Sequence, residues 1–314
     1  MNSVYIGIEE GLKYLPLILA ACILFRVAHF PDIGIEGTFA LGSSFIAFSS
    51  QLNCSFYFGL IGSGLVGALG GLLTATLFVK YRLNSLLCGI ITTFASYSTC
   101  FCLLGFKSNA SFETQLSEVK IGLLGLVLGI ALCIFFSTRY GLLLRIAGES
   151  PALLQKLGIN TNRKIIYLLL LGNFISGLSG ALVSSVEGTS SLFIADSKLF
   201  LVIISMVIGE GLLSLILYIK ELSLFQFFNF SIISEYFINI FYGAGVSYLV
   251  ISAIIGSFSY WIIYNVCTNF FGADEFTQII LGCITAILLI FTNKTTQNTY
   301  KLPPWTFIGD INID

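Results

Sequence analysis

The sequence predicts an all-α protein, a polytopic transmembrane helical bundle with about nine spans. Hydrophobic residues make up 56% of the 314 residues. Charged residues make up only 10%, against about 25% in soluble domains, and the mean hydropathy is +0.95. Apolar stretches of roughly the 20 residues that cross a bilayer recur along the whole chain, with brief polar interruptions. Residues 1–314 are therefore expected to form a single transmembrane domain.

The apolar runs define the expected spans, whose boundaries are soft by several residues. They cover residues 11–28, 33–50, 56–79, 84–105, 121–137, 165–186, 198–219, 246–268 and 276–291. One further stretch, 221–245, is apolar and aromatic but interrupted by Asn229, Glu235 and Asn239. It fits a span, a hairpin or a helix lying in the interface, and we expect the last of these.

The distribution of basic residues predicts the orientation. Lysine and arginine are enriched in cytoplasmic loops of membrane proteins. If the loop 138–164 is cytoplasmic, the basic residues on the cytoplasmic side are Lys80, Arg82, Arg139, Arg145, Lys156, Arg163, Lys164, Lys220, Lys294 and Lys301. The outside receives only Lys13, Lys107, Lys120 and Lys198, with Arg26 left unassigned.

Two expected spans carry small residues at every fourth position. The stripes are Ser63, Gly67, Gly71 and Ala75 in one span, and Gly172, Ser176, Gly180 and Ser184 in the other. Such stripes let helix backbones approach closely, so we expect dense helix packing at both. Their opposite orientations are compatible with an inverted repeat, which the sequence identity of the two halves does not establish.

The loop 138–164 contains the signals of a short helix with sharp ends. Ser150 is a suitable N-cap, Pro151 occupies the first helical position, and Gly158 supplies the left-handed residue that ends the helix. So short a helix is unstable alone in water and is expected to dock on something. Its apolar surface would consist of Ala152, Leu153, Leu154 and Leu157, with Gln155 and Lys156 to the side.

Two kinds of partner fit this helix. One is a groove on another protein, and the other is a layer of lipid headgroups, which the basic residues of the loop would also favour. We favour the protein because a helix lying on lipid does not need such sharp start and stop signals.

Three sequence segments resemble one family of transporters. "LRIAGESPALLQKLGINTNR" (144–163) resembles the cytoplasmic loop of ABC transporter permeases of the branched-chain amino acid, ribose and nucleoside import class. "FPDIGIEGTFALGS" (30–43) and "IGEGLL" (208–213) are similar to signatures of a subgroup named as tryptophan- or tyrosine-type amino acid permeases. The segments follow the family order. Residues 214–245 depart from the family pattern and look like an insertion.

The resemblance implies a set of partners and a location. In that family the loop helix, here 150–158, is a coupling helix that docks on a separate ATPase subunit. It also implies an extracytoplasmic solute-binding protein, a second permease copy, and the bacterial cytoplasmic (inner) membrane. The sequence has no GxxxxGK[ST] phosphate loop, so ATP must be bound by the partner, and we expect no cofactor and no enzymatic activity of this chain itself. The balanced net charge of −1 gives no indication of nucleic acid binding.

Residues around Pro31 are candidates for the translocation path. Proline cannot continue a helix, so we expect a broken or re-entrant helix there, with a fresh N-terminus in the second span. His29, Asp32 and Glu36 are grouped at this junction, and the two acids are one turn apart and expected to share a face. Either both acids complement the helix N-terminus at the cytoplasmic surface, or the broken helix lines the path.

Acidic residues elsewhere also allow two interpretations. Glu210 lies between two glycines within an apolar run. It is either a functional intramembrane acid or the end of a short span that meets water. Glu187 and Asp196 flank a polar outer segment, which is either a docking surface for a binding protein or, more simply, a solvated loop.

Three functions other than an ABC importer of an amino acid can be compared with the sequence. A permease for nucleosides or sugars fits the same family. An ion-gradient-driven secondary transporter would need paired buried ionisable residues, of which the sequence offers few. An intramembrane enzyme is disfavoured because the chain has one histidine and eight cysteines without a CxxC pair, which we interpret as apolar side chains and not as a metal centre.

Overall fold

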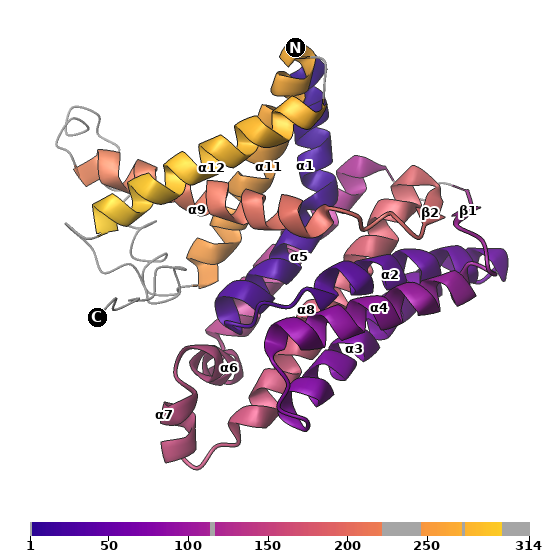
Figure 1. Cartoon of the computed structure of the whole chain (residues 1–314), viewed down its shortest axis with the longest axis horizontal. Coiled ribbons are helices and arrows are strands. Elements are labelled where there is room, and N and C mark those ends of the chain that lie inside the picture. Colours follow the sequence, from indigo (N-terminus) through magenta and orange to yellow (C-terminus); the bar gives the residue numbers. More distant parts are fainter. Residues whose placement is uncertain (1, 114–116, 222–245, 272–273, 297–314) are drawn as a thin grey trace.

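The protein is described by a computed structural model that covers residues 2–113, 117–221, 246–271 and 274–296. Almost all of these residues are helical (Figure 1). The elements are α1 (Asn2–Ala21), the π-helix η1 (Cys22–Val27), α2 (Gly34–Gln51), α3 (Phe56–Val79), α4 (Ser85–Leu103), β1 (Asn109–Ser111), α5 (Glu118–Ser137), α6 (Arg139–Glu149), α7 (Pro151–Lys156), α8 (Thr161–Glu187), β2 (Thr189–Ser191), α9 (Lys198–Glu221), α11 (Val246–Phe271) and α12 (Asp274–Thr296). The expected interfacial stretch 221–245, and most of the expected insertion 214–245, lie outside the described residues.

The all-α, multi-pass architecture agrees with the sequence, but the expected number of about nine spans is not confirmed. Six helices in the described ranges are long and apolar enough to cross a membrane: α3, α4, α5, α8, α9 and α11. Helices form at the other three expected spans as well. Helix α1 differs because it carries Glu9, Glu10 and Lys13, and α2 differs because it contains many hydroxyl and glycine residues. In α12, the described apolar stretch is Ile279–Ile290.

Helices α2, α3, α4 and α8 pack closely as one group, and both predicted small-residue stripes lie at helix contacts. A Cβ atom on Gly67 of α3 would lie 2.5 Å from the carbonyl oxygen of Asn173 in α8. A Cβ on Gly180 of α8 would lie 1.9 Å from the carbonyl oxygen of Phe39 in α2. The α3 stripe therefore faces α8. The α8 stripe faces α2, except at Gly172, which faces Leu24 of η1, and only glycine fits at Gly67 and Gly180.

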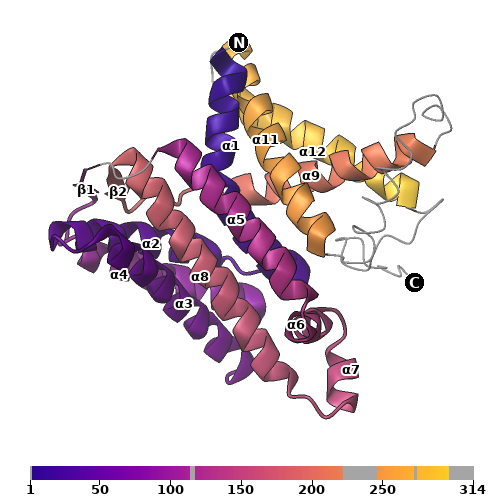
Figure 2. The ribbon, with the colours of Figure 1, turned by 180° about the vertical axis from the view of Figure 1, so that it is seen from behind.

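The second group consists of α1, α5, α9, α11 and α12, with α1 packed against both α5 and α11. Viewed from behind, α5 of the second group and α8 of the first run alongside each other where the two groups meet (Figure 2). Helix α1 continues through Pro16, although proline removes a backbone hydrogen bond from a helix interior. The break predicted at Pro31 is present, because regular helix stops at Val27 and resumes at Gly34.

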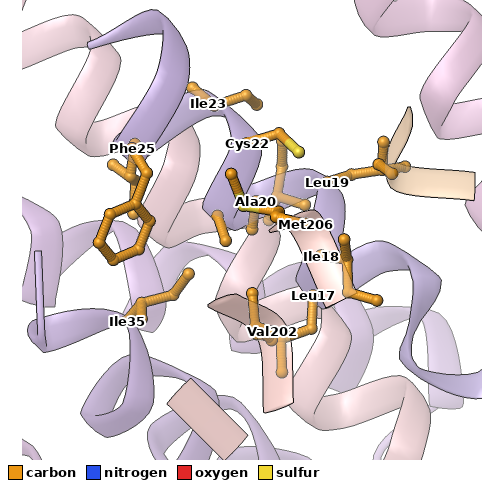
Figure 3. Close-up of a cluster of buried hydrophobic side chains, with 14 of the residues drawn as sticks. Leu17, Ile18, Leu19, Ala20, Cys22, Ile23, Phe25, Ile35, Val202 and Met206 are labelled. Atoms are coloured by element: carbon orange, nitrogen blue, oxygen red, sulfur yellow. The ribbon is translucent and has the colours of Figure 1, made fainter. Parts of the chain in front are cut away.

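The buried core joins the two groups where α1 and η1 meet α2 and α9. Figure 3 shows Leu17, Ile18 and Cys22 among the side chains of this cluster, with Val202 and Met206 contributed by α9. All five are at most 5% exposed. Because side chains of both groups are buried together in this cluster, the position of η1 relative to α9 is fixed. This relative position is part of the site described below.

The two short strands tie together the loops after α4 and after α8. They pair antiparallel, with Asn109 opposite Ser191 and Ser111 opposite Thr189. Two flanking backbone bonds extend the ladder, from Phe112 N to Gly188 O at 2.9 Å and from Leu192 N to Ser108 O at 3.0 Å. The ladder lies at the end of the molecule opposite to α6 and α7 (Figure 1).

Candidate functional site

The short helix predicted in the 138–164 loop is present as α7, residues Pro151–Lys156. Pro151 is at the first helical position, as predicted, and Gly158 adopts the left-handed conformation with φ +72°. Ile159 N donates to Leu154 O at 2.9 Å and Gly158 N to Gln155 O at 3.0 Å, which is the pair of bonds of a Schellman C-terminus. Ser150 occupies the N-cap position, but its side chain makes no capping hydrogen bond, because its backbone (φ −142°, ψ 73°) departs from the usual capping geometry.

The apolar surface of α7 differs in one respect from the prediction. Leu154 is fully buried, whereas Leu153 and Leu157 are 47% and 62% exposed. Leu154 therefore anchors the helix to the rest of the chain. Leu153 and Leu157 remain as an exposed apolar pair. Helix α7 itself lies at the extremity of the molecule (Figure 2).

A second helix in the same loop, α6, connects α7 to the transmembrane region. Thr138 caps it, since its Oγ1 accepts the N–H of Gly141 at 3.2 Å. At its other end, a Cβ on Gly148 would lie 2.0 Å from the carbonyl oxygen of Val27, the last residue of η1. The backbones of α6 and η1 thus touch directly at Gly148.

The π-helix η1 places Arg26 against Glu210 of α9. Arg26 Nε donates to Glu210 Oε1 at 2.6 Å, and a terminal guanidinium nitrogen, Nη2, donates to Glu210 Oε2, so the pair is bidentate. Their side chains are only 4% and 16% exposed. Glu210 is therefore not the water-exposed end of a short span but one half of a buried ion pair. Burial of two charges is tolerated when they are paired with good geometry.

Close helix packing fixes the position of Glu210. A Cβ on its neighbour Gly209 would lie 1.9 Å from the carbonyl oxygen of Ser252 in α11. Reciprocally, a Cβ on Gly256 would lie 2.0 Å from the carbonyl oxygen of Ser205 in α9. Gly209, one of the two glycines that flank Glu210, thus allows close backbone contact with α11.

Asp32 is fully buried among the helices and is not exposed to solvent. Its Oδ1 accepts the backbone N–H of Gly34 at 2.8 Å, at the start of α2, and its Oδ2 accepts Asn173 Nδ2 at 2.9 Å. The carboxylate does complement the helix N-terminus, as one interpretation held, but it does so inside the helix group.

Asn173 extends this contact into a network of buried polar groups. Its Oδ1 accepts the hydroxyl of Thr38 at 2.9 Å, and its Nδ2 also donates to Leu169 O. The Ser176 hydroxyl donates to Ile35 O at 2.8 Å, which adds a second link between α2 and α8. Every polar side chain in the network is paired, and this rigidifies the broken-helix junction.

The remaining predicted path residues do not gather around Asp32. His29 and Pro31 are exposed, and His29 has a positive φ of 49°. Partial desolvation, and secondly the charge of Arg26, hold the pKa of His29 below its usual range. Glu36 is half-buried next to the Ser197 backbone and Asp196. Asp32 and Glu36 do not share a helix face, because α2 begins only at Gly34 and Asp32 belongs to the preceding turn.

Sequence reasoning missed Arg26 and Asn173 as site residues. Each is a strongly polar side chain inside an apolar run, and such a residue needs a partner in a membrane protein. That was the available signal. The partners themselves, Glu210 and Asp32, are far away along the chain and follow only from the packing of the helices.

The chain matches one family model and is similar to two known proteins. A family model described as "Branched-chain amino acid transport system / permease component" matches residues 14–292. The "Tyrosine transport system permease protein" of Clostridioides difficile (strain R20291) is 29% identical over 229 residues, covering 70% of this chain and 77% of that protein. An uncharacterized protein of Rickettsia prowazekii (strain Madrid E) is 26% identical over 202 residues, covering 61% and 71%. No solved structure matches.

Proposed function

The chain belongs to the family of branched-chain amino acid transport system permease components, and we propose accordingly that it is the membrane-spanning subunit of an ABC importer for an amino acid. It works in the bacterial cytoplasmic membrane with a separate ATPase, a solute-binding protein and a second permease copy. The permease itself binds no ATP. The relative named as a tyrosine transport permease supports an amino acid as the substrate, in preference to a nucleoside or a sugar.

The observation that carries the proposal is the exposed pair Leu153 and Leu157 on α7. The helix has only six residues and depends on docking for its stability. Leu154 provides docking on one side, and the exposed pair provides an apolar surface for a partner on the other. A groove on the ATPase subunit is the partner we propose for it.

The contacts beyond α7 support a route by which ATPase movement reaches the spans. A displacement of α7 moves α6, whose Gly148 touches η1 at Val27. One residue earlier, Arg26 holds Glu210 in the middle of α9. A two-state change in the ATPase would thus bias the relative positions of η1 and α9, which is the differential contact that coupling requires.

We assign the translocation path to the broken-helix junction and the neighbouring part of α9, with His29, Asp32, Glu36 and Glu210 as its polar residues and Pro31 at the break. The buried Asp32 supports this assignment, since irregular backbone at depth is tolerated beside protein or water.

The test is co-purification of the ATPase from mild detergent. The variant Leu153→Asp/Leu157→Asp is compared with wild type and with Leu52→Asp. Leu52 is a matched control because it is 59% exposed but follows α2 at the opposite end of that helix from the broken junction. We expect a P-loop ATPase with wild type and with the control, and its loss from the double variant.

Each outcome has a definite meaning. Equal recovery of the ATPase with the double variant would overturn the role of α7. If no ATPase accompanies any of the chains, the ABC mechanism fails, and a gradient-driven secondary transporter becomes the function to test by uptake in cells without the ATPase.

A further inference from the structure

A cluster of charged and aromatic side chains lies where α1, α8, α9 and α11 meet, away from the coupling route. Lys13 and Tyr14 come from α1, Glu187 is the last residue of α8, Lys198 is the first residue of α9, and Trp261 comes from α11. The orientation predicted from the basic residues puts Lys13 and Lys198 on the outer side of the membrane. This is the side at which an importer receives its substrate.

The charged residues of the cluster are unequally paired. Lys13 Nζ lies 2.8 Å from Glu187 Oε1 and 3.5 Å from Glu10 Oε1, so one ammonium group has two carboxylates. Lys198 Nζ lies 4.7 Å from the centroid of the Tyr14 ring. Lys198 forms no ion pair with any described residue.

The aromatic residues provide a second donor that lacks an acceptor. The Tyr14 and Trp261 rings are stacked, with centroids 5.2 Å apart and an interplanar angle of 14°. Tyr14 is 3% exposed and Trp261 is 9% exposed. The buried indole Nε1 of Trp261 has no hydrogen-bond acceptor within the described part of the chain. A buried donor without an acceptor is costly and requires an explanation.

The Lys198 ammonium group and the Trp261 indole N–H both lie next to the Tyr14 ring, and both lack an acceptor among the described residues. This favours a ligand with an anionic group and an aromatic side chain. Together with Glu10, the cluster carries two lysines and two glutamates and therefore has no net charge. It thus favours neither a simple anion nor a simple cation. A ligand with one carboxylate and one ammonium group matches this arrangement. Glu187 can turn to the ligand ammonium while Lys13 keeps Glu10 as its partner.

We propose that this Tyr14 cluster is a binding site for a zwitterionic aromatic amino acid on its way into the importer. The ligand carboxylate would be bound by Lys198 and the Trp261 indole N–H, and its ammonium group by Glu187. Its ring would pack on the Tyr14–Trp261 pair, as aromatic rings do in stacked or edge contacts. The inference rests on the proposed function and specifies the substrate class of the permease.

The test measures equilibrium binding of radiolabelled tyrosine to the purified full-length permease in lipid vesicles, without a solute-binding protein. Tyramine, which lacks the carboxylate, and 3-(4-hydroxyphenyl)propionate, which lacks the ammonium group, serve as competitors. Wild type is expected to prefer tyrosine over each by about tenfold or more, since a charge-assisted contact is lost with either competitor.

Three variants separate the contributions. Lys198→Gln is expected to weaken tyrosine binding about tenfold while leaving tyramine unchanged. Glu187→Gln should instead reduce the preference for tyrosine over the propionate analogue. Lys107→Gln, at an exposed lysine in the loop after α4, is the matched control and should bind like wild type.

Fluorescence of Trp261 provides a second measurement of ligand binding, without a radiolabel. Trp305→Phe leaves Trp261 as the only tryptophan of the chain, and phenylalanine is expected to change its emission whereas phenethylamine is not. Variants are first checked by gel filtration, and where Lys198→Gln does not fold, this emission measurement decides alone.

The proposal is overturned if wild type does not distinguish tyrosine from tyramine, or if Lys198→Gln weakens both equally. Co-purification of the ATPase is measured on the same preparations. A permease that keeps its ATPase but binds no aromatic amino acid contradicts the Tyr14 cluster as a site while leaving the importer function intact.

Discussion

Arg26 and Glu210 form a bidentate, buried ion pair between segments separated by 184 residues of sequence. Arg26 lies in a π-helix and Glu210 next to a glycine that touches α11. Short π-helical turns occur often at functional sites. The pair links the end of the first helix to the middle of α9, and four predictions follow from it and from its surroundings.

Removal of one charge from this pair is expected to destabilise the protein more than removal of both. Glu210→Gln removes the carboxylate that faces the buried Arg26 guanidinium, and loss of one partner of a buried ion pair costs about 3–5 kcal/mol. Arg26→Met combined with Glu210→Met removes both charges and should recover most of that loss. Thermal unfolding in detergent measures this, and a double variant less stable than either single variant would contradict it.

Neutralisation of the path acids is expected to reduce transport without disrupting assembly. Asp32→Asn keeps an oxygen to accept the Gly34 N–H, so the start of α2 survives, while the buried negative charge and the acceptor for Asn173 Nδ2 are lost. We expect uptake to fall by about tenfold, and a smaller fall for Glu36→Gln, which is only half-buried. Glu113→Gln, an exposed acid in the loop after α4, is the control. Unchanged uptake in both path variants would remove these acids from the path.

A methyl group at Gly148 is expected to uncouple the ATPase from transport. The Cβ of Gly148→Ala would meet the Val27 carbonyl oxygen at 2.0 Å and force α6 away from η1. The exposed pair on α7 is unaffected, so the ATPase should still co-purify. Uptake should fall by about five- to thirtyfold, corresponding to about 1–2 kcal/mol of coupling. Joint loss of ATPase and uptake would indicate misfolding of the loop, and unchanged uptake would exclude the contact from the route.

The crossing of α2 and α8 is expected to tolerate nothing larger than glycine. In Gly42→Ala the Cβ would lie 1.9 Å from the Gly177 carbonyl oxygen, a backbone atom that cannot move aside. We expect destabilisation of about 1–3 kcal/mol or more, visible as a lower melting temperature in detergent. Gly282→Ala on α12 is the matched control because nothing lies within 4 Å of its Cβ. Equal stability of the two variants would show that the crossing is not close-packed.

The sequence was sufficient for those features that depend on local chemistry. Pro151 and Gly158 predicted where the loop helix begins and ends, and the break at Pro31 was predicted from proline geometry alone. The apolar runs located the helices, and α3 begins and ends at the expected residues Phe56 and Val79. These signals act within a few residues and need no knowledge of packing.

Features that depend on contacts across the chain could not be predicted. Arg26 was left without an assignment because its partner is on α9 and because the π-helical turn that directs it has no sequence signature. Asp32 was placed on a helix face with Glu36, but its actual partner Asn173 is on α8.

The β1–β2 ladder limits how the ends of α4 and α8 can move. Because it joins the loops after α4 and after α8, these two helix ends are expected to move together. Parting α4 from α8 at this end would require the ladder to break, whereas parting α8 from α1 would require the Lys13–Glu187 salt bridge to break. If the proposed importer opens at this end of the molecule, that salt bridge would act as its latch.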